Sequence, residues 1–405
     1  MSEIFKKHER NYFKSQVYGG EEPLRKLFLA NPHHSQFALL SFFASEDKKA
    51  KKYLKEEFGI LGIDSVLFSL REPYWNKRKV STYKKKLGDS HFWYAGGKVA
   101  LFLEKLFKYS YAPMSGSERI EVALGQMKTK ERRYCFIPNQ EKLQQIADGL
   151  TPKEFFARLE SLYFSDLIDP SGVDIQINIT IEGSEKPITF IELSEGERQL
   201  ITVLGLMRFT AEEEALFLLD EPDTHQNPAW CLDYLHNLRK YGAEPPNSQI
   251  IINTHSPLTF AGLEKNEVVL LEKTDNSISS HHPISSPRGM GFDAILTSDF
   301  FGMRSTLDRF TLEKLDKMRM LSFKKDKTNE EIEEYMILSR ELDDLDFSSS
   351  VGDPLYLEFV RAMIKAQGED KKISEVVPSK AAWEKRKRIA NDIAKKLKGK
   401  DDEIH

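Results

Sequence analysis

Three short segments near the middle of this 405-residue chain bring hydroxyl, carboxyl and imidazole groups into a regular order. They are 193–199 (LSEGERQ), 215–225 (ALFLLDEPDTH) and 250–256 (IIINTHS). Backbone N–H groups at a helix start bind phosphates, and carboxylates can hold Mg²⁺ or activate a water molecule. Together the three segments predict a site for phosphate chemistry.

Ser194 and Gly196 precede the apolar run 200–209 (LITVLGLMRF), which predicts a helix. The unpaired N–H groups and the dipole at the start of such a helix favour an anion. The same serine–glycine pair also suits ordinary helix capping. By itself the segment therefore indicates either a helix cap or an anion site.

Asp220 and Glu221 follow an apolar run that predicts a buried strand, and His255 follows a second such run. Ligands bind at the carboxyl ends of strands in open α/β sheets. Because adjacent side chains diverge at a strand end, one carboxylate can hold Mg²⁺ while the other polarises water. A histidine at this edge can donate a hydrogen bond to a terminal phosphate, although a lone histidine is more often structural.

The elements that must position these groups alternate between strands and helices. Apolar runs at 214–219 and 249–253 predict central parallel strands buried on both faces. Thr151 and Glu154 predict a capping box at a helix start. Further patterns predict strands at 64–70, 133–137, 174–181 and 268–271, and amphipathic helices at 306–323, 328–345 and 355–366.

Composition shifts divide the chain into three predicted regions. Residues 1–110 are helical, aromatic-rich and basic, residues 111–275 form an α/β core, and residues 276–405 are helical. The first hundred residues hold 19 Lys and Arg against 11 Asp and Glu, whereas the whole chain has a net charge of −4. Such a basic lobe suits binding to a polyanion, and it equally suits an ordinary solvated surface.

Cysteine usage and hydropathy exclude several protein classes. Cys135 and Cys231 lack any paired spacing, so neither a disulfide framework nor a zinc site is expected. No apolar stretch reaches the length of a membrane span, and the charged N-terminus is unlike a signal peptide. We therefore expect a cytoplasmic protein with no membrane contact.

The last predicted segment, 379–400, carries nine Lys and Arg against two acidic residues. A run of cations with little base-reading chemistry suits contact with nucleic-acid phosphates. The acidic body of the same protein is an equal alternative partner.

The order of the three central segments resembles the ABC-type ATPases of the RecF/SMC-like class. In that resemblance LSEGE corresponds to the signature motif, ALFLLDE to Walker B with its catalytic glutamate, and NTHSP to the switch-histidine loop. It implies an α/β fold, namely an ABC-type ATPase head with a mixed sheet and flanking helices. Helical N-terminal and C-terminal regions would adjoin this head.

The resemblance also implies a role for each position. Asp220 would bind Mg²⁺, Glu221 would be the general base for water and His255 would sense the γ-phosphate of ATP. Ser194 and Gly196, with Glu195 between them, would contact a nucleotide held mainly by a partner subunit, so the active unit would be a dimer. Asp223 and His225 fall in the D-loop, which in this family crosses the dimer interface; they count as nucleotide-binding residues in the same prediction.

The phosphate-binding loop of this family, G-x-x-x-x-G-K-[ST], does not occur in the sequence. The nearest match, Gly96-Gly97-Lys98, has Phe92 at the first glycine position and Val99 at the hydroxyl position, and it is interpreted as a loop turn. We expect that the chain begins downstream of the loop. A partner chain that supplies the loop and a genuine loss of catalysis are the alternatives.

Four further stretches resemble the ATPases found with HNH nucleases in Septu-type and retron defence systems against phage. They are 92–106, 193–230, 287–308 and 352–363, with Arg198 and Gln226 departing from the expected glutamine and leucine. The resemblance implies ATP-driven homodimers or higher oligomers that bind and control an HNH-type nuclease. A reverse transcriptase with its DNA or RNA would be a further partner.

Functions of other classes remain as alternatives. A RecF/SMC-like DNA-repair ATPase predicts coiled-coil arms longer than the helices at 306–345. A fused nuclease predicts clustered carboxylates, but Asp343, Asp344 and Asp346 sit on a polar helix end that suits solvation. A non-catalytic structural subunit is supported by the missing phosphate loop, and a transporter ATPase is disfavoured because nothing suggests a membrane partner.

Overall fold

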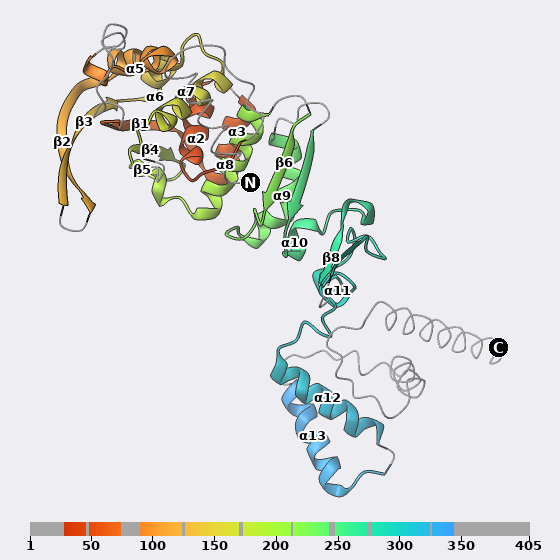
Figure 1. The fold of residues 1–405 in the computed structure, drawn as a ribbon. Helices are drawn as coiled ribbons and strands as arrows, with labels where there is room; N and C mark the ends of the chain where they lie inside the picture. Colours follow the sequence, from red (N-terminus) through yellow and green to blue (C-terminus); the bar gives the residue numbers. More distant parts are fainter. Residues whose placement is uncertain are drawn as a thin grey trace. The chain divides into compact units, whose positions relative to one another are not determined.

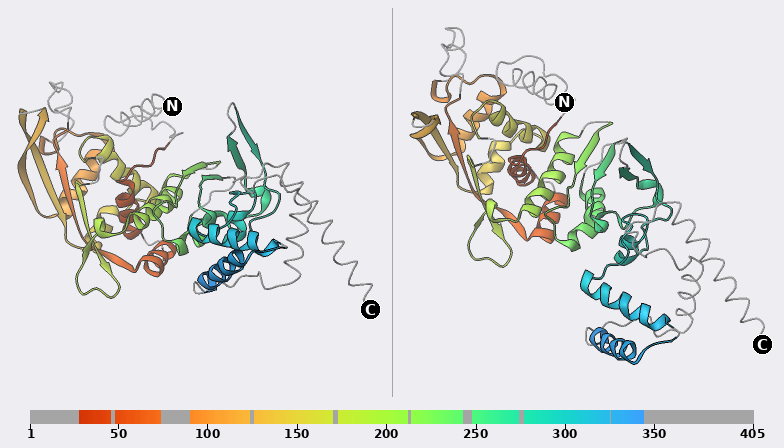
Figure 2. Two further views of the ribbon diagram at one scale, coloured as in Figure 1. Left: turned by 90° about the horizontal axis from the view of Figure 1, so that it is seen from below. Right: turned by 60° about the horizontal axis from the view of Figure 1, so that its bottom comes forward.

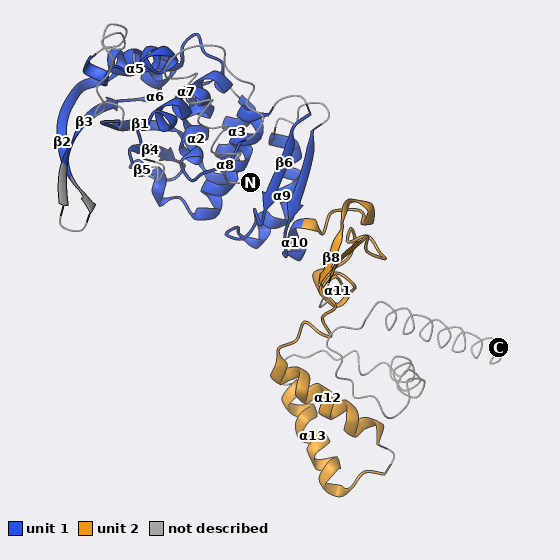
Figure 3. Cartoon of the chain, viewed as in Figure 1, with its two compact units in different colours: residues 1–259 blue, residues 260–405 orange. Residues whose placement is uncertain are grey.

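The computed structural model describes residues 28–45, 48–73, 90–123, 126–169, 173–211, 214–242, 248–273, 277–324 and 326–343. The chain divides into two compact units, Met1–Thr259 and Phe260–His405, which Figure 3 shows in different colours. The helix predicted at 355–366 and the basic segment 379–400 lie outside the described residues.

A five-stranded antiparallel sheet forms one side of the first unit (Figure 1). Its order is β2-β3-β1-β4-β5, with the bounds β1 Ile60–Arg71, β2 Tyr111–Ala123, β3 Gln126–Ile137, β4 Ile175–Ile181 and β5 Ile188–Thr189. Strand β1 is central, because Val66 lies opposite Ile137 of β3 and Ile177 of β4. The N-terminal region and the predicted core therefore share one sheet.

The strands predicted at 64–70, 133–137 and 174–181 are confirmed, but β1 and β3 begin well before their predicted starts, at Ile60 and Gln126. Sequence patterning missed the hairpin partner β2, which pairs with β3 from Tyr111 to Ala123. Gly116 and charged residues along β2 hide the alternation that marks a half-buried strand. The hairpin lies at the outer edge of the sheet in both views of Figure 2.

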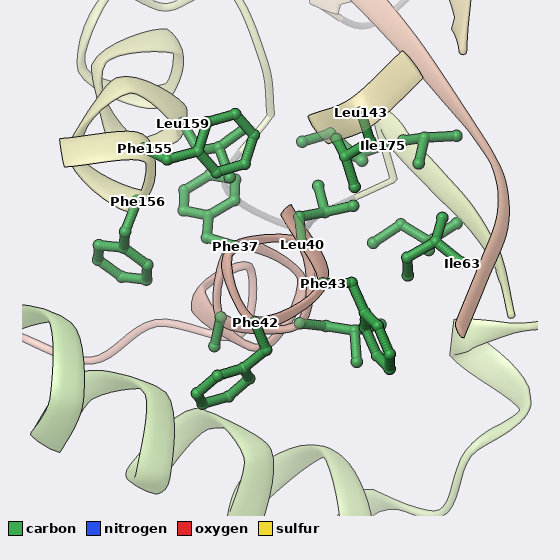
Figure 4. Packing of buried hydrophobic residues seen from close by; sticks show 14 of the residues in the cluster. Phe37, Leu40, Phe42, Phe43, Ile63, Leu143, Phe155, Phe156, Leu159 and Ile175 are labelled. Atoms are coloured by element: carbon green, nitrogen blue, oxygen red, sulfur yellow. The ribbon is translucent and has the colours of Figure 1, made fainter. Parts of the chain in front are cut away.

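Helix α2 (His34–Ala44) fills the centre of the first unit and is buried on nearly every side. A helix that is apolar all round must be enclosed by other elements, and Figure 2 shows α2 seen end-on between the sheet and α8 (Glu195–Thr210). Phe37 of α2 lies toward Phe155 and Phe156 of α7 (Pro152–Phe164), and Phe43 lies on the side of Ile63 of the sheet, in one apolar cluster (Figure 4). This cluster is the main core.

The remaining helices of the first unit cover this core. Their bounds are α3 Lys48–Phe58, α5 Gly97–Tyr109, α6 Gln140–Ala147, α7 Pro152–Phe164 and α9 Pro228–Tyr241, with 3-10 turns η2 Ser90–Phe92 and η3 Phe190–Glu192. The capping box predicted for α7 is confirmed. The Thr151 side chain accepts from the Glu154 N–H, and Glu154 accepts from the Thr151 N–H.

Strands β6 (Leu216–Asp220) and β7 (Gln249–Asn253) pair in parallel, as the sequence predicts. The prediction that both faces are buried is wrong for the described residues. Phe217, Leu219, Ile250 and Ile252 pack against the core, but the other face is open and Leu218 is 69% exposed. In these strands, residues that face the core therefore alternate with residues that are exposed.

The second unit contains a small hairpin and a helical pair. Its elements are α10 Pro257–Phe260, which begins in the first unit, η4 Lys265–Glu267, β8 Leu270–Lys273, β9 Ile278–His281, α11 Phe292–Thr297, α12 Arg309–Phe323 and α13 Asn329–Asp343. Helices α12 and α13, predicted at 306–323 and 328–345, pack through Leu315, Met318 and Leu338. Their apolar faces are therefore partly buried against each other.

Candidate functional site

The parallel pair β6–β7 places Asp220 and Glu221 beside the segment that carries His255. Asp220 lies opposite Asn253, and the Asn253 side chain donates a hydrogen bond of 2.8 Å to Asp220 Oδ1. The Glu221 N–H donates to the Asn253 carbonyl at 2.8 Å. Backbone pairing therefore extends one residue past the strands and fixes both carboxylates at the carboxyl edge.

Glu221 and His255 meet across this edge. Nδ1 of His255 lies 3.1 Å from Oε1 of Glu221, so a proton on Nδ1 forms a hydrogen bond to the carboxylate. Both side chains are exposed. Glu221 has a φ of 44°, a left-handed conformation that is uncommon outside glycine. The hydroxyl of Thr224 donates to the Glu221 carbonyl at 2.9 Å and holds this turn.

Ser194 caps helix α8. Its hydroxyl accepts from the Glu197 N–H at 3.2 Å, and its own N–H donates to Glu197 Oε2 at 2.6 Å. Of the two interpretations of the serine–glycine pair, the structure therefore shows the helix cap. Ser194 and Glu195 are nevertheless exposed, so the start of α8 stays accessible.

Gly196 packs against the turn that follows Glu221. A Cβ atom at this position would lie 2.4 Å from the His225 carbonyl oxygen and 3.2 Å from the Cα of Gln226. Glu195 Oε1 also lies 3.7 Å from Nε2 of His225. Only glycine allows this approach of two backbones, so the signature segment and the D-loop segment touch within one chain.

Asp223 points inward, whereas Glu221 and Thr224 are exposed. It is 5% exposed. Its Oδ2 accepts hydrogen bonds from the hydroxyl of Thr254, at 2.7 Å, and from that of Thr259. The sequence interpretation missed both threonines, although the position of Thr254 beside His255 was an available signal.

The segment Gly96-Gly97-Lys98, the nearest match to the phosphate-binding loop, lies elsewhere in the first unit. Gly96 is the N-cap of α5, Gly97 has a φ of 60° and Val99 is fully buried. Helix α5 lies on the opposite side of the first unit from β6 (Figure 1). The segment is thus a helix start preceded by a turn.

Comparison with known proteins gives a family for the central region. Residues 78–261 match the family model described as "AAA domain, putative AbiEii toxin, Type IV TA system". The matched range includes the three segments 193–199, 215–225 and 250–256. This part of the chain is therefore similar to an AAA-family domain.

Two curated proteins are similar to part of this chain. The "Septu protein PtuA" of Bacillus mycoides (strain KBAB4) is 30% identical over 185 residues, which is 44% of this chain and 24% of the relative. The "Retron Vc95 probable ATPase" of Vibrio cholerae serotype O1 biovar El Tor is 24% identical over 195 residues, 45% of this chain and 36% of the relative. The matched regions thus span about a quarter to a third of those proteins.

One solved structure has a weak likeness to the chain. It is described as "Structural biochemistry of ATP-driven dimerization and DNA stimulated activation of SMC ATPases", and it matches with 19% identity and a TM-score of 0.23 over 29% of this chain and 69% of that one. At that score the likeness supports no argument about function. Within the described ranges, no helix is long and apolar enough to cross a membrane.

Proposed function

We propose that this chain is the ATPase part of a defence complex against phage, in which ATP-dependent dimerisation controls an associated nuclease. One observation carries the ATPase part of the proposal. A carboxylate and an imidazole, Glu221 and His255, lie 3.1 Å apart at the carboxyl edge of two parallel strands. The two relatives from Septu and retron systems support the defence context.

The donor groups at this edge fit a magnesium–nucleotide complex. Mg²⁺ is usually held by one or two carboxylates, with phosphate oxygens and waters completing its six ligands. Asp220 and Glu221 are exposed carboxylates, and no cluster of three or more His, Cys, Asp or Glu in the described part of the chain could hold a metal ion by itself. Asp220 would therefore hold the ion together with phosphate oxygens, and a bound ion would offset phosphate charge.

In this proposal the protein groups have separate tasks. Glu221 is the general base for the attacking water, and its backbone is fixed by the Asn253 carbonyl and the Thr224 hydroxyl. With Nδ1 of His255 donating to Glu221, Nε2 is the ring nitrogen available to the terminal phosphate. Ser194, Glu195, Gly196 and His225 would meet nucleotide held by a second subunit.

The test is Glu221→Gln, which removes the base and keeps the shape of the side chain. In an ATPase assembly that includes a phosphate-binding loop, turnover of ATP should fall by roughly 10²- to 10⁴-fold, because general base catalysis contributes about that factor. Nucleotide binding and an ATP-bound dimer should remain, as measured by calorimetry and light scattering. Glu214→Gln, at the other end of β6 and also exposed, is the matched control and should not change turnover.

The alternative is a non-catalytic structural subunit, which the absent G-x-x-x-x-G-K-[ST] pattern favours. Without that pattern the isolated 405-residue chain should bind ATP weakly. Micromolar affinity by calorimetry would show that phosphates are bound elsewhere in the chain. Equal turnover in wild type and Glu221→Gln would instead remove Glu221 from the mechanism.

A further inference from the structure

The loop that carries His255 is held by the buried carboxylate of Asp223. Thr254 and Thr259 stand on either side of this loop, and both hydroxyls donate to the same oxygen, Oδ2 of Asp223. Asp223 is 5% exposed and Thr259 2% exposed. We call this group, Asp223 with the hydroxyls of Thr254 and Thr259, the Asp223 bracket.

The bracket also acts on the residue after His255. The hydroxyl of Thr254 accepts a hydrogen bond of 3.0 Å from the Ser256 N–H while it donates to Asp223. Thr254 therefore links the carboxylate to the backbone on the far side of the histidine. Two points of the short segment 254–259 are thereby fixed around His255.

The same carboxylate belongs to the turn that begins at Glu221. Asp223 is two residues beyond Glu221, and its carbonyl accepts from the Gln226 N–H at 3.1 Å. One end of the bracket is thus fixed in the Glu221 turn and the other end in the His255 loop. Packed and hydrogen-bonded contacts deform little. A shift of the Glu221 turn should therefore shift the His255 loop, and the reverse.

The bracket is costly for a purely structural device. Oδ1 of Asp223 is buried and has no hydrogen-bond partner among the described residues. Burying a carboxylate without a cation or a full set of donors destabilises a fold. The pKa of the nearby Tyr234 hydroxyl is raised, first by burial and second by the negative charge of Asp223. A neutral polar side chain would hold two threonines at lower cost.

We infer that Asp223 is a positioning residue and not the nucleotide-binding residue that the motif resemblance implies. Through Thr254 and Thr259 it sets the distance between Glu221 and His255, and it does not itself touch nucleotide. The inference rests on the proposed function only for its consequence in turnover. The geometric part, that the bracket fixes the 254–259 segment, stands independently. One measurement therefore tests the geometry of the bracket, and a second tests its consequence for ATP turnover.

The first measurement is hydrogen–deuterium exchange over 254–259 in the full chain. Asp223→Ala should speed amide exchange there by roughly tenfold or more, because hydrogen bonds to a charged acceptor are among the stronger ones in proteins. Thr259→Val should have a smaller effect in the same direction, and Thr259→Ser, which keeps the hydroxyl, should restore slow exchange. Asp233→Asn, an exposed acid on α9, is the matched control and should leave exchange unchanged.

The second measurement is steady-state ATP turnover with the same variants, in an ATPase assembly that includes a phosphate-binding loop. Asp223→Ala and Thr259→Val should lower kcat by roughly 10- to 100-fold with KM changed little, because a misplacement of about 1 Å costs up to that factor. Thr259→Ser should recover kcat. A general loss of folding would change exchange throughout the unit and would not be rescued by serine.

The outcomes separate cleanly. Unchanged exchange at 254–259 in folded Asp223→Ala and Thr259→Val would overturn the bracket. Faster exchange with kcat unaffected in an active protein would overturn its positioning role. Faster exchange with no ATP turnover in any variant, wild type included, would support the bracket and count against the proposed ATPase function.

Discussion

The five-stranded sheet and the strand pair β6–β7 lie in the same unit and both pack one face on the core, but their core-facing residues are buried to different depths. In β1, Val66, Phe68 and Leu70 are almost completely buried. In β6, alternate residues face the core while Leu218 is 69% exposed. The strand pair that holds the candidate site is thus the more open region of the two, and the five-stranded sheet contributes no residue to the site. Stability and chemistry are expected to respond to different mutations.

The largest effect should come from the core on which the five-stranded sheet packs. Phe156, 1% exposed, has ring contacts with His34, Phe37 and Phe209. Phe156→Ala should lower the free energy of unfolding by about 3–5 kcal/mol, because it removes apolar contacts and leaves a cavity. Urea unfolding followed by circular dichroism measures this.

The matched substitution in the open region is Leu218→Thr, which keeps a strand-forming residue. Its cost should stay within about 0.5 kcal/mol, as for exposed surface sites. A loss of unfolding free energy as large as that of Phe156→Ala would show that the outer face of β6–β7 is covered in solution. It would contradict the difference in burial between the two regions.

An intermediate effect is expected where the α8 start meets the turn after Glu221. Gly196→Ala places a methyl group against the His225 carbonyl, which is backbone and cannot move aside. We expect a loss of about 1–3 kcal/mol from overpacking, even though alanine favours helices more than glycine does. Thermal unfolding should show this. Gly262→Ala is the control, since a Cβ there meets nothing within 4 Å; equal shifts would argue against the contact.

A modest effect is expected at the cap of α7. Thr151→Ala should cost about 1 kcal/mol, and Thr151→Ser, which keeps the oxygen, should cost less. The backbone hydrogen bond from Thr151, followed by the one from its hydroxyl, lowers the pKa of Glu154.

The pH dependence of this cap has a definite sign. Because the folded pKa of Glu154 is depressed, its contribution is present above the unfolded pKa and is lost as the pH falls through the folded value. The difference in unfolding free energy between wild type and Glu154→Gln should therefore be full at about pH 7 and should decline as the pH falls below about 4.3, the ordinary pKa of glutamate. A difference that does not change with pH through this acidic range would contradict this account.

Local patterns in the sequence predicted local structure well. Thr151 with Glu154 marks the α7 cap, and the apolar runs before Asp220 and before His255 give β6 and β7 in parallel. These features depend on neighbours in sequence. The parallel pairing also brings the two motifs together, so the Glu221–His255 contact agrees with the motif order.

Features that depend on distant packing could not be predicted in the same way. Leu218 is an apolar residue within an apolar run, which usually indicates a buried strand. Only the three-dimensional arrangement leaves it exposed. Asp223 sits in a polar turn, where solvent exposure is the ordinary expectation, yet Thr254 and Thr259 turn it inward. Partners 31 and 36 residues away along the chain decide its orientation.

The left-handed backbone at Glu221 has a consequence for how this site can change over generations. A glutamate there carries a conformational cost of roughly 1–3 kcal/mol, and glycine would carry almost none. In a chain under no demand for a base, drift at this position should favour glycine or asparagine, which gain stability. A homologous sequence that keeps an acid at this position therefore signals continued selection for chemistry, and one that carries glycine signals release from it. Position 221 can thus report, from sequence alone, which relatives have stopped using the site.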